Sequence, residues 1–216
     1  AENCEMYAIA GRNMEKAERF KETYGFQKAY GSYEKLLADP KVEAVYIPLP
    51  NTMHYEWTIR ALKSGKHVLC EKPLAPTEAQ AEEMFKAAEE NHVYLMEAFA
   101  YQHSPYIAAV RKEIENGTIG DVRYMESAYI TSDYDPKNIR MRRDTLGGCT
   151  YDLGVYNTSL ILRILGDEPA KVRAIASFSE EKIDTLTSAI FEYADGKKAA
   201  FSCGMALATD LDRHID

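Results

Sequence analysis

A glutamate and a lysine followed by a proline form the first place in this sequence where chemistry could occur. Glu71 and Lys72 come directly after the apolar run at 67–70, and Pro73 disfavours a helical backbone at Lys72. The lysine side chain would then project in a fixed direction from the end of a strand. Such a lysine can polarise a carbonyl or influence a neighbouring acid, whereas the alternative is a surface charge pair before a helix.

A second candidate lies in the run GGCTYDLGVY at 147–156, where a glycine pair leads into a predicted helix. Asp152 and Tyr156 are four residues apart, which would place them on one helical face. Tyr156 could donate or accept a proton if a cation such as Lys72 lay near it, and Asp152 could hydrogen-bond that lysine or a substrate. A tyrosine on a mostly apolar helix can also be core packing, so this motif alone is weak.

Two further loops follow predicted strands. Arg12 lies just after the run at 6–10 with no acidic residue beside it, and an arginine at such a strand end can accommodate the 2′-phosphate of NADP. Its alternative is a solvated arginine at a helix start. The segment PLPNTMH at 48–54 ends another strand, and Asn51 is predicted to cap the following helix, leaving backbone N–H groups for a polar ligand. The alternative is a plain strand end.

Several catalytic motifs are missing from the sequence. The glycines fit neither G-x-G-x-x-G nor G-x-x-x-x-G-K, and there is no H-E-x-x-H or G-x-S-x-G. His54 and Glu56 resemble an H-x-E motif, but no P-C-x-x-C follows, so we predict no metal site. The four cysteines are widely spaced, which favours buried thiols in a reducing compartment over disulfides or zinc.

The elements that would position these residues change character along the chain. Residues 1–100 alternate short apolar strands (6–10, 44–47, 67–70 and 93–98) with helices, including one capped by Asn13 and closed by Gly25 and one with a T-x-x-Q capping box at 77–91. This predicts a doubly wound parallel sheet covered on both faces. Residues 101–216 contain helices at 104–116 and 150–165 and strands at 122–131, 172–178, 186–193 and 199–205, which predicts an antiparallel sheet with helices on one face.

Composition restricts the class of protein. The chain has 216 residues, 46% hydrophobic and 28% charged, and its 26 basic and 34 acidic residues give a net charge of −8. This predicts a folded protein that binds no nucleic acid. Apolar runs are too short to cross a bilayer and the first residues carry no signal region, so we expect a soluble, cytoplasmic protein. The first residue is alanine and the last ones carry no turn signal, so truncation at either end is possible.

Taken together, five stretches of sequence resemble the Gfo/Idh/MocA family of NAD(P)-dependent oxidoreductases over nearly the whole chain. They are HVLCEKP with the upstream SYEKLLADPKVEAVYI and PLPNTMH, then MEAFAYQHSP at 96–105, and LGGCTYDLGVYN at 146–157. The tyrosine that ends D-x-G-x-Y, together with MEAF, is most similar to the glucose-fructose oxidoreductase and dihydrodiol dehydrogenase branch. The inositol dehydrogenases carry a histidine there.

This resemblance implies a Rossmann domain, here without its first strand and glycine-rich loop, then an α+β domain whose open sheet often forms an oligomer contact. It implies that Lys72 is the catalytic lysine, Tyr156 the proton donor or acceptor and Asp152 a substrate-side partner. The residues expected to line the cofactor, NADP by preference or NAD, are Arg12, Leu49, Pro50, Asn51, His54, Glu71, Lys72 and Gln102. Cys149 and Gln102 depart from the family, which often has glycine and arginine at these positions, and these departures concern the substrate more than the reaction.

The leading hypothesis is therefore a dehydrogenase or reductase that transfers a hydride between NAD(P) and a sugar, polyol or cyclic diol, assembled as a homodimer or tetramer. The alternative is a protein of the same fold that binds a nucleotide or sugar as a regulator or scaffold without turnover, since fold does not settle function. A third possibility is a partial chain that has neither property.

Overall fold

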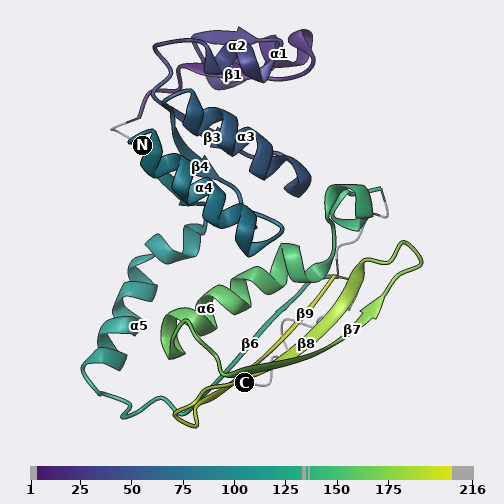
Figure 1. Ribbon diagram of the computed structural model, residues 1–216. Coiled ribbons are helices and arrows are strands. Elements are labelled where there is room, and N and C mark those ends of the chain that lie inside the picture. The colour runs from purple at the N-terminus through teal and green to yellow at the C-terminus, as the bar shows by residue number, and fades with distance from the viewer. Residues whose placement is uncertain (1–3, 133–134, 136, 206–216) are drawn as a thin grey trace. The chain divides into compact units, whose positions relative to one another are not determined.

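The computed structural model describes residues 4–132, 135 and 137–205 (Figure 1). The chain divides into two compact units. Unit 1 comprises Ala1–Leu49, Met53–Glu71 and Thr77–Glu97, and unit 2 comprises Pro50–Thr52, Lys72–Pro76 and Ala98–Asp216. The short segments that carry Asn51 and Lys72 thus belong, by their contacts, to unit 2.

Unit 1 alternates strands and helices, and all its strand pairs are parallel. One sheet has the order β1-β2 and the other the order β3-β4-β5. The parallel, helix-separated arrangement predicted for the first half is confirmed; strand β2, with three residues, was not predicted. The elements are β1 (Ala8–Ala10), α1 (Met14–Tyr24), β2 (Lys28–Tyr30), α2 (Tyr33–Leu37), β3 (Ala44–Ile47), α3 (Asn51–Lys63), β4 (His67–Cys70), α4 (Glu78–Glu90) and β5 (Leu95–Glu97).

Three helix ends in unit 1, two of α1 and one of α4, follow from local sequence. The Asn13 side chain accepts a hydrogen bond from the Lys16 N–H at the start of α1, and Gly25 ends that helix in the left-handed conformation with φ of 74°. Thr77 caps α4 as the capping box predicts. The cap predicted at Asn51 is wrong, because this residue is already the first residue of α3.

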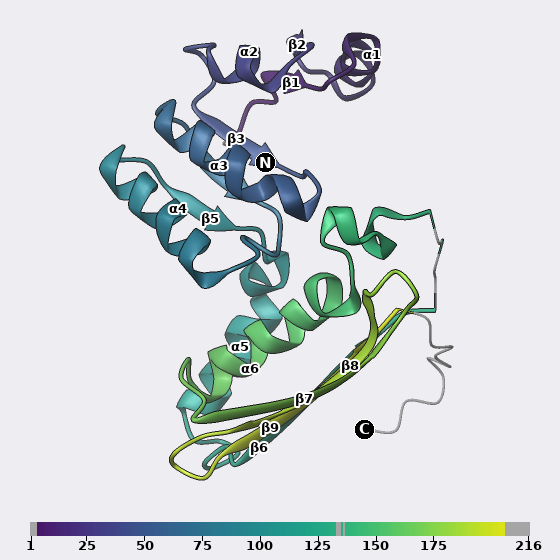
Figure 2. The same cartoon turned by 45° about the vertical axis from the view of Figure 1, so that its right-hand side comes forward.

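The β3-β4-β5 sheet has one covered and one exposed face. Helices α3 and α4 lie side by side along one face in both views (Figures 1 and 2), where Val68 and Cys70 are buried. The opposite face carries Tyr46 and Met96, which flank Leu69 in register and are 55% and 46% exposed. Cover on both faces was predicted, but among the described residues this second face is open.

Unit 2 contains a four-stranded sheet in the order β6-β9-β8-β7, in which β6 and β9 are parallel and the other two pairs antiparallel. Helix α6 lies along one face of it (Figures 1 and 2). The mostly antiparallel open sheet predicted for the second half is confirmed. The helices and strands are α5 (Pro105–Glu115), β6 (Tyr124–Ile130), α6 (Val155–Leu165), β7 (Lys171–Phe178), β8 (Asp184–Glu192) and β9 (Lys198–Gly204), with 3₁₀ turns at Ala100–His103, Ile139–Met141 and Arg143–Thr145 and a π-helical turn at Thr150–Gly154.

The core of unit 2 lies between α6 and the sheet. Leu153, Ile161 and Leu165 pack there against Phe191 and Phe201 of the central strands. Burying these side chains stabilises the unit by about 1.5–3 kcal/mol for each large apolar residue. In contrast, all eight residues of the edge strand β7 are exposed.

The cysteines are all free thiols, as predicted. Cys70, Cys149 and Cys203 are buried, whereas Cys4 is exposed, so the prediction of buried thiols is wrong for that residue. Within the described part of the chain, no helix has the length and apolar character needed to cross a membrane.

Candidate active site

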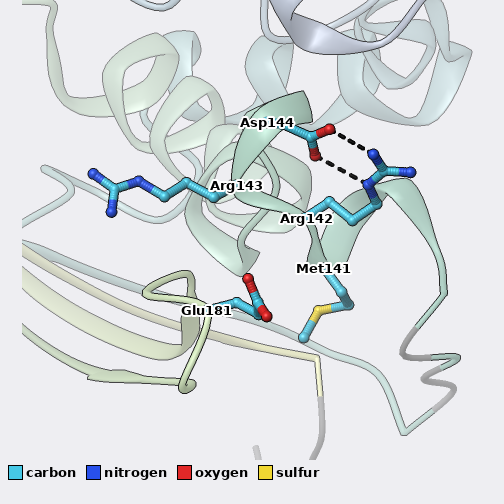
Figure 3. Close-up of a pocket in the computed structure, with 5 residues that line it drawn as sticks. All are labelled: Met141, Arg142, Arg143, Asp144 and Glu181. Carbon is cyan, nitrogen blue, oxygen red and sulfur yellow. Dashed lines mark hydrogen bonds and ion pairs between the residues drawn. The ribbon is translucent and has the colours of Figure 1, made fainter.

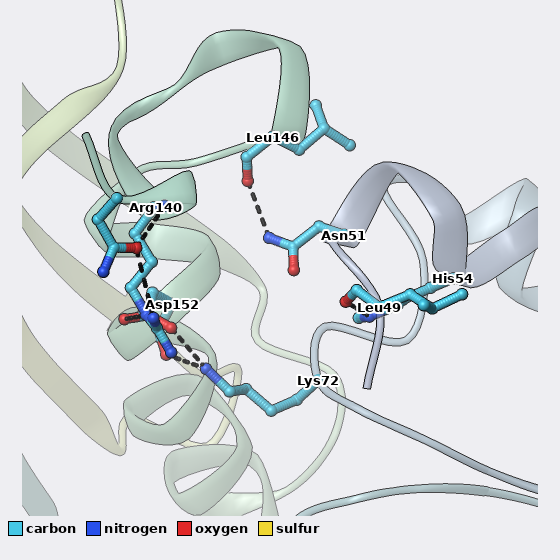
Figure 4. A network of polar contacts seen from close by, with 8 residues as sticks. Leu49, Asn51, His54, Lys72, Arg140, Leu146 and Asp152 are labelled. Atoms are coloured by element: carbon cyan, nitrogen blue, oxygen red, sulfur yellow. Dashed lines mark hydrogen bonds and ion pairs between the residues drawn. The ribbon is translucent and has the colours of Figure 1, made fainter. Parts of the chain in front are cut away.

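Lys72 and Asp152 form the centre of the candidate site, although they are 80 residues apart in the chain (Figure 4). Lys72 Nζ donates to Asp152 Oδ1 at 2.8 Å and to the Asp152 backbone oxygen at 2.6 Å. The two side chains are only 12% and 17% exposed. An ion pair with this little solvent is screened less than a surface pair, and its two hydrogen bonds define where the ammonium lies.

Tyr156 joins this pair through its ring. Lys72 Nζ lies 5.0 Å from the ring centroid of Tyr156, which is within the range of a cation–π contact. The structure therefore brings together Lys72, Asp152 and Tyr156, the three residues that the sequence predicts to be catalytic. Their roles in catalysis stay predictions.

Aromatic side chains surround the Tyr156 ring. Phe99 lies edge-on to it with a centroid distance of 5.5 Å, Tyr129 of β6 lies at 5.6 Å, and Tyr101 lies at 6.2 Å. Tyr101 is itself held by a hydrogen bond of 2.8 Å between its hydroxyl and Ser159 Oγ. Edge-to-face and tilted pairs at these separations are favourable, so the cluster fixes the Tyr156 ring next to the ammonium.

The backbone between Asp152 and Tyr156 is not the regular helix that the sequence predicts over 150–165. Thr150–Gly154 is a π-helical turn, and the Val155 N–H donates to the Thr150 oxygen five residues earlier. Gly154 allows this turn to pack directly on β9, because a Cβ there would lie 3.1 Å from Cys203 Sγ. Such turns are rare and occur frequently at functional sites.

A half-buried carboxylate holds the start of this turn from strand β8. Asp184 Oδ2 accepts hydrogen bonds from the Thr150 N–H at 2.7 Å, the Thr150 hydroxyl at 2.6 Å and the Thr187 hydroxyl at 3.0 Å, and the Cys149 thiol lies 3.0 Å away. Burial opposes ionisation, but these hydrogen bonds outweigh it and lower the pKa of the Asp184 carboxyl. Asp184 was not predicted as part of the site.

The same cluster makes Cys149 a structural residue. Its hydrogen bond with Cys203, its burial and the nearby Asp184 carboxylate all raise the pKa of the Cys149 thiol above its ordinary value. A thiol held in this way is a poor nucleophile. Cys149 also has an ordinary right-handed backbone, so the glycine that is frequent in the family at this position is not needed here for conformational reasons.

Arg140 is a second cation at the site that sequence reasoning missed (Figure 4). Its Nε donates to Asp152 Oδ2 at 2.9 Å, on the carboxylate oxygen that Lys72 does not use. The only sequence signal for it is the arginine-rich run IRMRRD at 139–144, which by itself is indistinguishable from a solvated loop.

Four of the predicted cofactor-lining residues belong to unit 1. Leu49 and Glu71 follow β3 and β4, whose last residues Ile47 and Cys70 pair in register, so both lie at the carboxyl edge of that sheet. Arg12 follows β1, is exposed and has no ion-pair partner among the described residues. Carboxyl edges of parallel strands are where ligands bind in such sheets.

His54, the fourth, is buried beside the loop that follows β3, and its role as a cofactor-lining residue stays a prediction. It is 1% exposed, and its Nε2 lies 2.7 Å from the Leu49 backbone oxygen (Figure 4). A buried ring in this position holds the loop after β3.

The other four lining candidates, Lys72 among them, belong to unit 2. Asn51, which follows Pro50, donates from Nδ2 to the Leu146 backbone oxygen at 2.8 Å (Figure 4). The Gln102 side chain donates to Ser159 Oγ at 3.1 Å and accepts from Arg163 on α6. These amide side chains therefore hold protein segments together.

A pocket of about 600 Å³ lies on the loop that follows Arg140 (Figure 3). Its lining residues are Met141, Arg142, Arg143, Asp144 and Glu181. None of the predicted catalytic residues lines it, and two of its charges neutralise one another because Arg142 pairs with Asp144 at 2.5 Å. We therefore assign the candidate chemistry to the group around Asp152.

Comparisons with known proteins agree on one family. Residues 1–99 match the family described as "Oxidoreductase family, NAD-binding Rossmann fold" of the Gfo/Idh/MocA group, and residues 107–215 match the C-terminal domain of the same group. A trans-1,2-dihydrobenzene-1,2-diol dehydrogenase of Mus musculus is 34% identical over 94% of this chain and 61% of its own length.

Two further similarities concern reductases of Actinomadura kijaniata. A dTDP-3,4-didehydro-2,6-dideoxy-alpha-D-glucose 3-reductase is 37% identical over 82% of this chain and 53% of its own length. The crystal structure of a 3-ketoreductase in complex with NADP and TDP-benzene superposes with a TM-score of 0.86 at 34% identity, covering 94% of this chain and 62% of that one. The chain thus spans 53–62% of the length of these relatives.

Proposed function

Because the chain belongs to the Gfo/Idh/MocA oxidoreductase family, we propose that the protein transfers a hydride between NAD(P) and the carbinol or carbonyl carbon of a sugar, polyol or cyclic diol. The observation that carries this proposal is the convergence of Lys72, Asp152 and Tyr156 within unit 2. A lysine, a carboxylate and a phenol in contact can orient an oxygen, stabilise charge on it and exchange its proton.

The residues present fit a dinucleotide at the carboxyl edge of the unit 1 strands. Leu49 and Glu71 lie there, α3 begins directly after Pro50, and Arg12 offers an exposed guanidinium at the end of β1. An arginine at that strand end favours NADP over NAD, because it can pair with the 2′-phosphate. The nicotinamide, when bound, supplies or accepts the hydride.

In the oxidation direction, the phenolate form of Tyr156 takes the proton of the substrate hydroxyl and becomes the phenol. The Lys72 ammonium directs one N–H at the substrate oxygen and stabilises the negative charge that develops on it. Asp152 holds the ammonium with two hydrogen bonds, so that little reorganisation is needed during the reaction. In the reduction direction, Tyr156 returns the proton to the oxygen.

The aromatic cluster supports a substrate that has an apolar face. Phe99, Tyr101 and Tyr129 surround Tyr156, and Tyr129 is 42% exposed, so part of this surface is open to a ligand. The ring faces of sugars and cyclic diols carry C–H groups that pack well on aromatic rings. The similar proteins include a cyclic diol dehydrogenase and a sugar reductase, which agrees with this substrate class.

We also propose that the protein acts as a homo-oligomer through the open sheet of unit 2. Every residue of β7 is exposed, and Ile175 and Phe178 are 78% and 66% exposed. Large apolar side chains exposed on a sheet favour a protein contact. Light scattering of the purified protein would test this, since a monomer at micromolar concentration would contradict it.

The substitution Lys72→Met tests the reaction. We expect kcat to fall about 10³-fold, because the charge next to the reacting oxygen is lost, while the Kd for NADPH changes by less than about threefold. Turnover would be measured as NADPH consumption or formation over a panel of sugars, ketosugars and cyclic diols. Binding would be followed by nucleotide fluorescence.

Lys66→Met is the matched control, because Lys66 is also buried but donates to the Asp39 backbone oxygen in unit 1. It should retain the wild-type kcat. Unchanged turnover in Lys72→Met would contradict the proposal. NADPH binding without any consumption by the wild-type protein would favour a nucleotide-binding regulator instead.

A further inference from the structure

The Asp152 carboxylate lies between two cations. Lys72 Nζ donates a hydrogen bond to Oδ1 at 2.8 Å, and Arg140 Nε donates one to Oδ2 at 2.9 Å (Figure 4). The terminal torsion of an aspartate is broad and roughly two-fold, so a single partner defines the plane of the carboxylate poorly. A second cation on the other oxygen restricts that rotation. The direction in which Lys72 points then depends on Arg140 as well as on Asp152.

The backbone at Arg140 is fixed from both sides. The Asn138 side chain accepts from the Arg140 N–H at 3.0 Å, and the Gly148 N–H donates to the Arg140 oxygen at 2.7 Å. Gly147 makes this approach possible, because a Cβ there would lie 2.2 Å from the Arg140 oxygen. A freely moving surface arginine needs none of these contacts.

We propose that Arg140 is a positioning residue, which holds the Asp152 carboxylate and through it the Lys72 ammonium. This inference rests on the proposed function of Lys72. Arg140 also changes the net charge of the group formed by Lys72, Asp152 and Arg140, because two cations and one carboxylate have a net charge of +1. A bare Lys72–Asp152 pair would be neutral and would stabilise a developing negative charge less well.

The competing explanation is an ordinary ion pair of no consequence for the reaction. The Arg140 side chain is 50% exposed, and exposed pairs contribute little to stability. The two explanations predict different kinetics. Removing an ordinary ion pair leaves kcat unchanged. Removing a positioning residue lowers kcat, and it does so only through the effect on Asp152.

The experiment compares Arg140→Met, Arg140→Lys and the control Arg142→Met in the protein. Arg142 lies on the same loop, pairs with Asp144 and does not contact Asp152. We expect Arg140→Met to lower kcat about 30- to 100-fold, with a Kd for NADPH within about threefold and an unchanged circular dichroism spectrum. Arg140→Lys should recover part of the lost rate, because it restores the charge but lacks the Nε geometry. Arg142→Met should keep the wild-type kcat.

A double-mutant cycle with Asp152→Asn then separates the two roles. If Arg140 acts through Asp152, adding Arg140→Met to Asp152→Asn should lower kcat less than threefold further. Independent, multiplying effects would overturn the proposal, as would a kcat for Arg140→Met within threefold of wild type. If Arg140→Met does not fold, Arg140→Lys and its cycle with Asp152→Asn decide the question alone.

The failure of this inference differs from the failure of the proposed function. If Lys72→Met keeps its turnover, the reaction assignment itself is wrong. If Lys72→Met is inactive while Arg140→Met and Arg140→Lys have wild-type kcat, only the role of Arg140 is wrong.

Discussion

Asp39 in unit 1 and Asp152 in unit 2 are both poorly exposed aspartates bound by cations, but their partners differ. Asp39 Oδ2 accepts from the Tyr30 hydroxyl at 2.5 Å, Lys28 Nζ at 2.9 Å and the Tyr7 hydroxyl at 3.0 Å, and Oδ1 accepts from the backbone of residue 41 at 2.9 Å. Asp152 instead has two cations and no hydroxyl donor in the described structure.

The positions of the two aspartates explain this difference. Tyr7 precedes β1 and Lys28 begins β2, so Asp39 joins the starting ends of two strands, away from the carboxyl edge where ligands bind. Asp152 lies in a π-helical turn beside Tyr156. A carboxylate satisfied by several protein donors stabilises the fold, whereas one that holds an ammonium beside a phenol can serve a reaction.

Asp152→Asn should have the largest effect. The amide retains the shape of the side chain but loses the charge that holds Lys72 and Arg140, so we expect kcat to fall about 100-fold. Steady-state kinetics with the best substrate of the panel would measure it. Asp39→Asn is the control and should keep kcat within about threefold. Equal losses of activity in both variants would remove the distinction between the two aspartates.

Gly147→Ala should have the next largest effect, this time on stability. The new Cβ would overlap the Arg140 carbonyl at 2.2 Å, and backbone cannot move aside as a side chain can. We expect a loss of about 3 kcal/mol in the free energy of unfolding, measured by urea denaturation with circular dichroism. Gly31→Ala in unit 1 is the control, because its Cβ would meet only the flexible Met14 side chain at 3.4 Å. Equal stability of the two variants would show that the Arg140 loop is not fixed as described.

Asp39→Asn should lower the thermal stability of unit 1 by more than Asp152→Asn lowers that of unit 2. We expect its Tm to fall by about 5 °C. Trp57, the single tryptophan, lies on α3 in unit 1, so its fluorescence reports this transition. A Tm within about 1 °C of wild type would contradict a stabilising role of Asp39.

The pH dependence of stability should sharpen the same contrast. Hydrogen bonds from Tyr30 and then Lys28 lower the pKa of the Asp39 carboxyl below its ordinary value. A lowered folded-state pKa means that the stabilisation is present above the unfolded value of about 4 and is lost as the pH falls through the lower folded value. Wild-type unit 1 should thus lose urea resistance below about pH 4 more steeply than Asp39→Asn. Parallel curves would exclude this contribution.

Sequence reasoning succeeded where the signal is local. The caps at Asn13 and Thr77 and the end of α1 at Gly25 depend on residues within one helical turn, and they occur as predicted. At Asn51 a similar local signal failed, because this residue is already the first residue of α3; its Nδ2 donates to the distant Leu146 oxygen. Strand β2 was missed because three residues carry too little pattern, and its pairing with β1 defines it.

The same limit applies to the candidate site. Lys72, Asp152 and Tyr156 could be selected because strand ends, spacing and family resemblance all point to them. Arg140 and Asp184 could not, since each acts through a contact between a loop or strand and the turn before α6. The π-helical turn has no local sequence signature either, because it depends on how closely Gly154 packs on β9.

The smallest predicted effect concerns one donor at each aspartate. Tyr7→Phe removes one of the four hydrogen bonds that the Asp39 carboxylate accepts, and the remaining donors keep it satisfied. We therefore expect a loss of about 1 kcal/mol in the free energy of unfolding, measured by urea titration of Trp57 fluorescence, and an unchanged kcat. The Asp152 carboxylate has no such additional donors among the described residues, because each of its two oxygens is bound by one cation. If Tyr7→Phe lowered kcat as much as Arg140→Met does, the charge networks of the two units would not be separate in function.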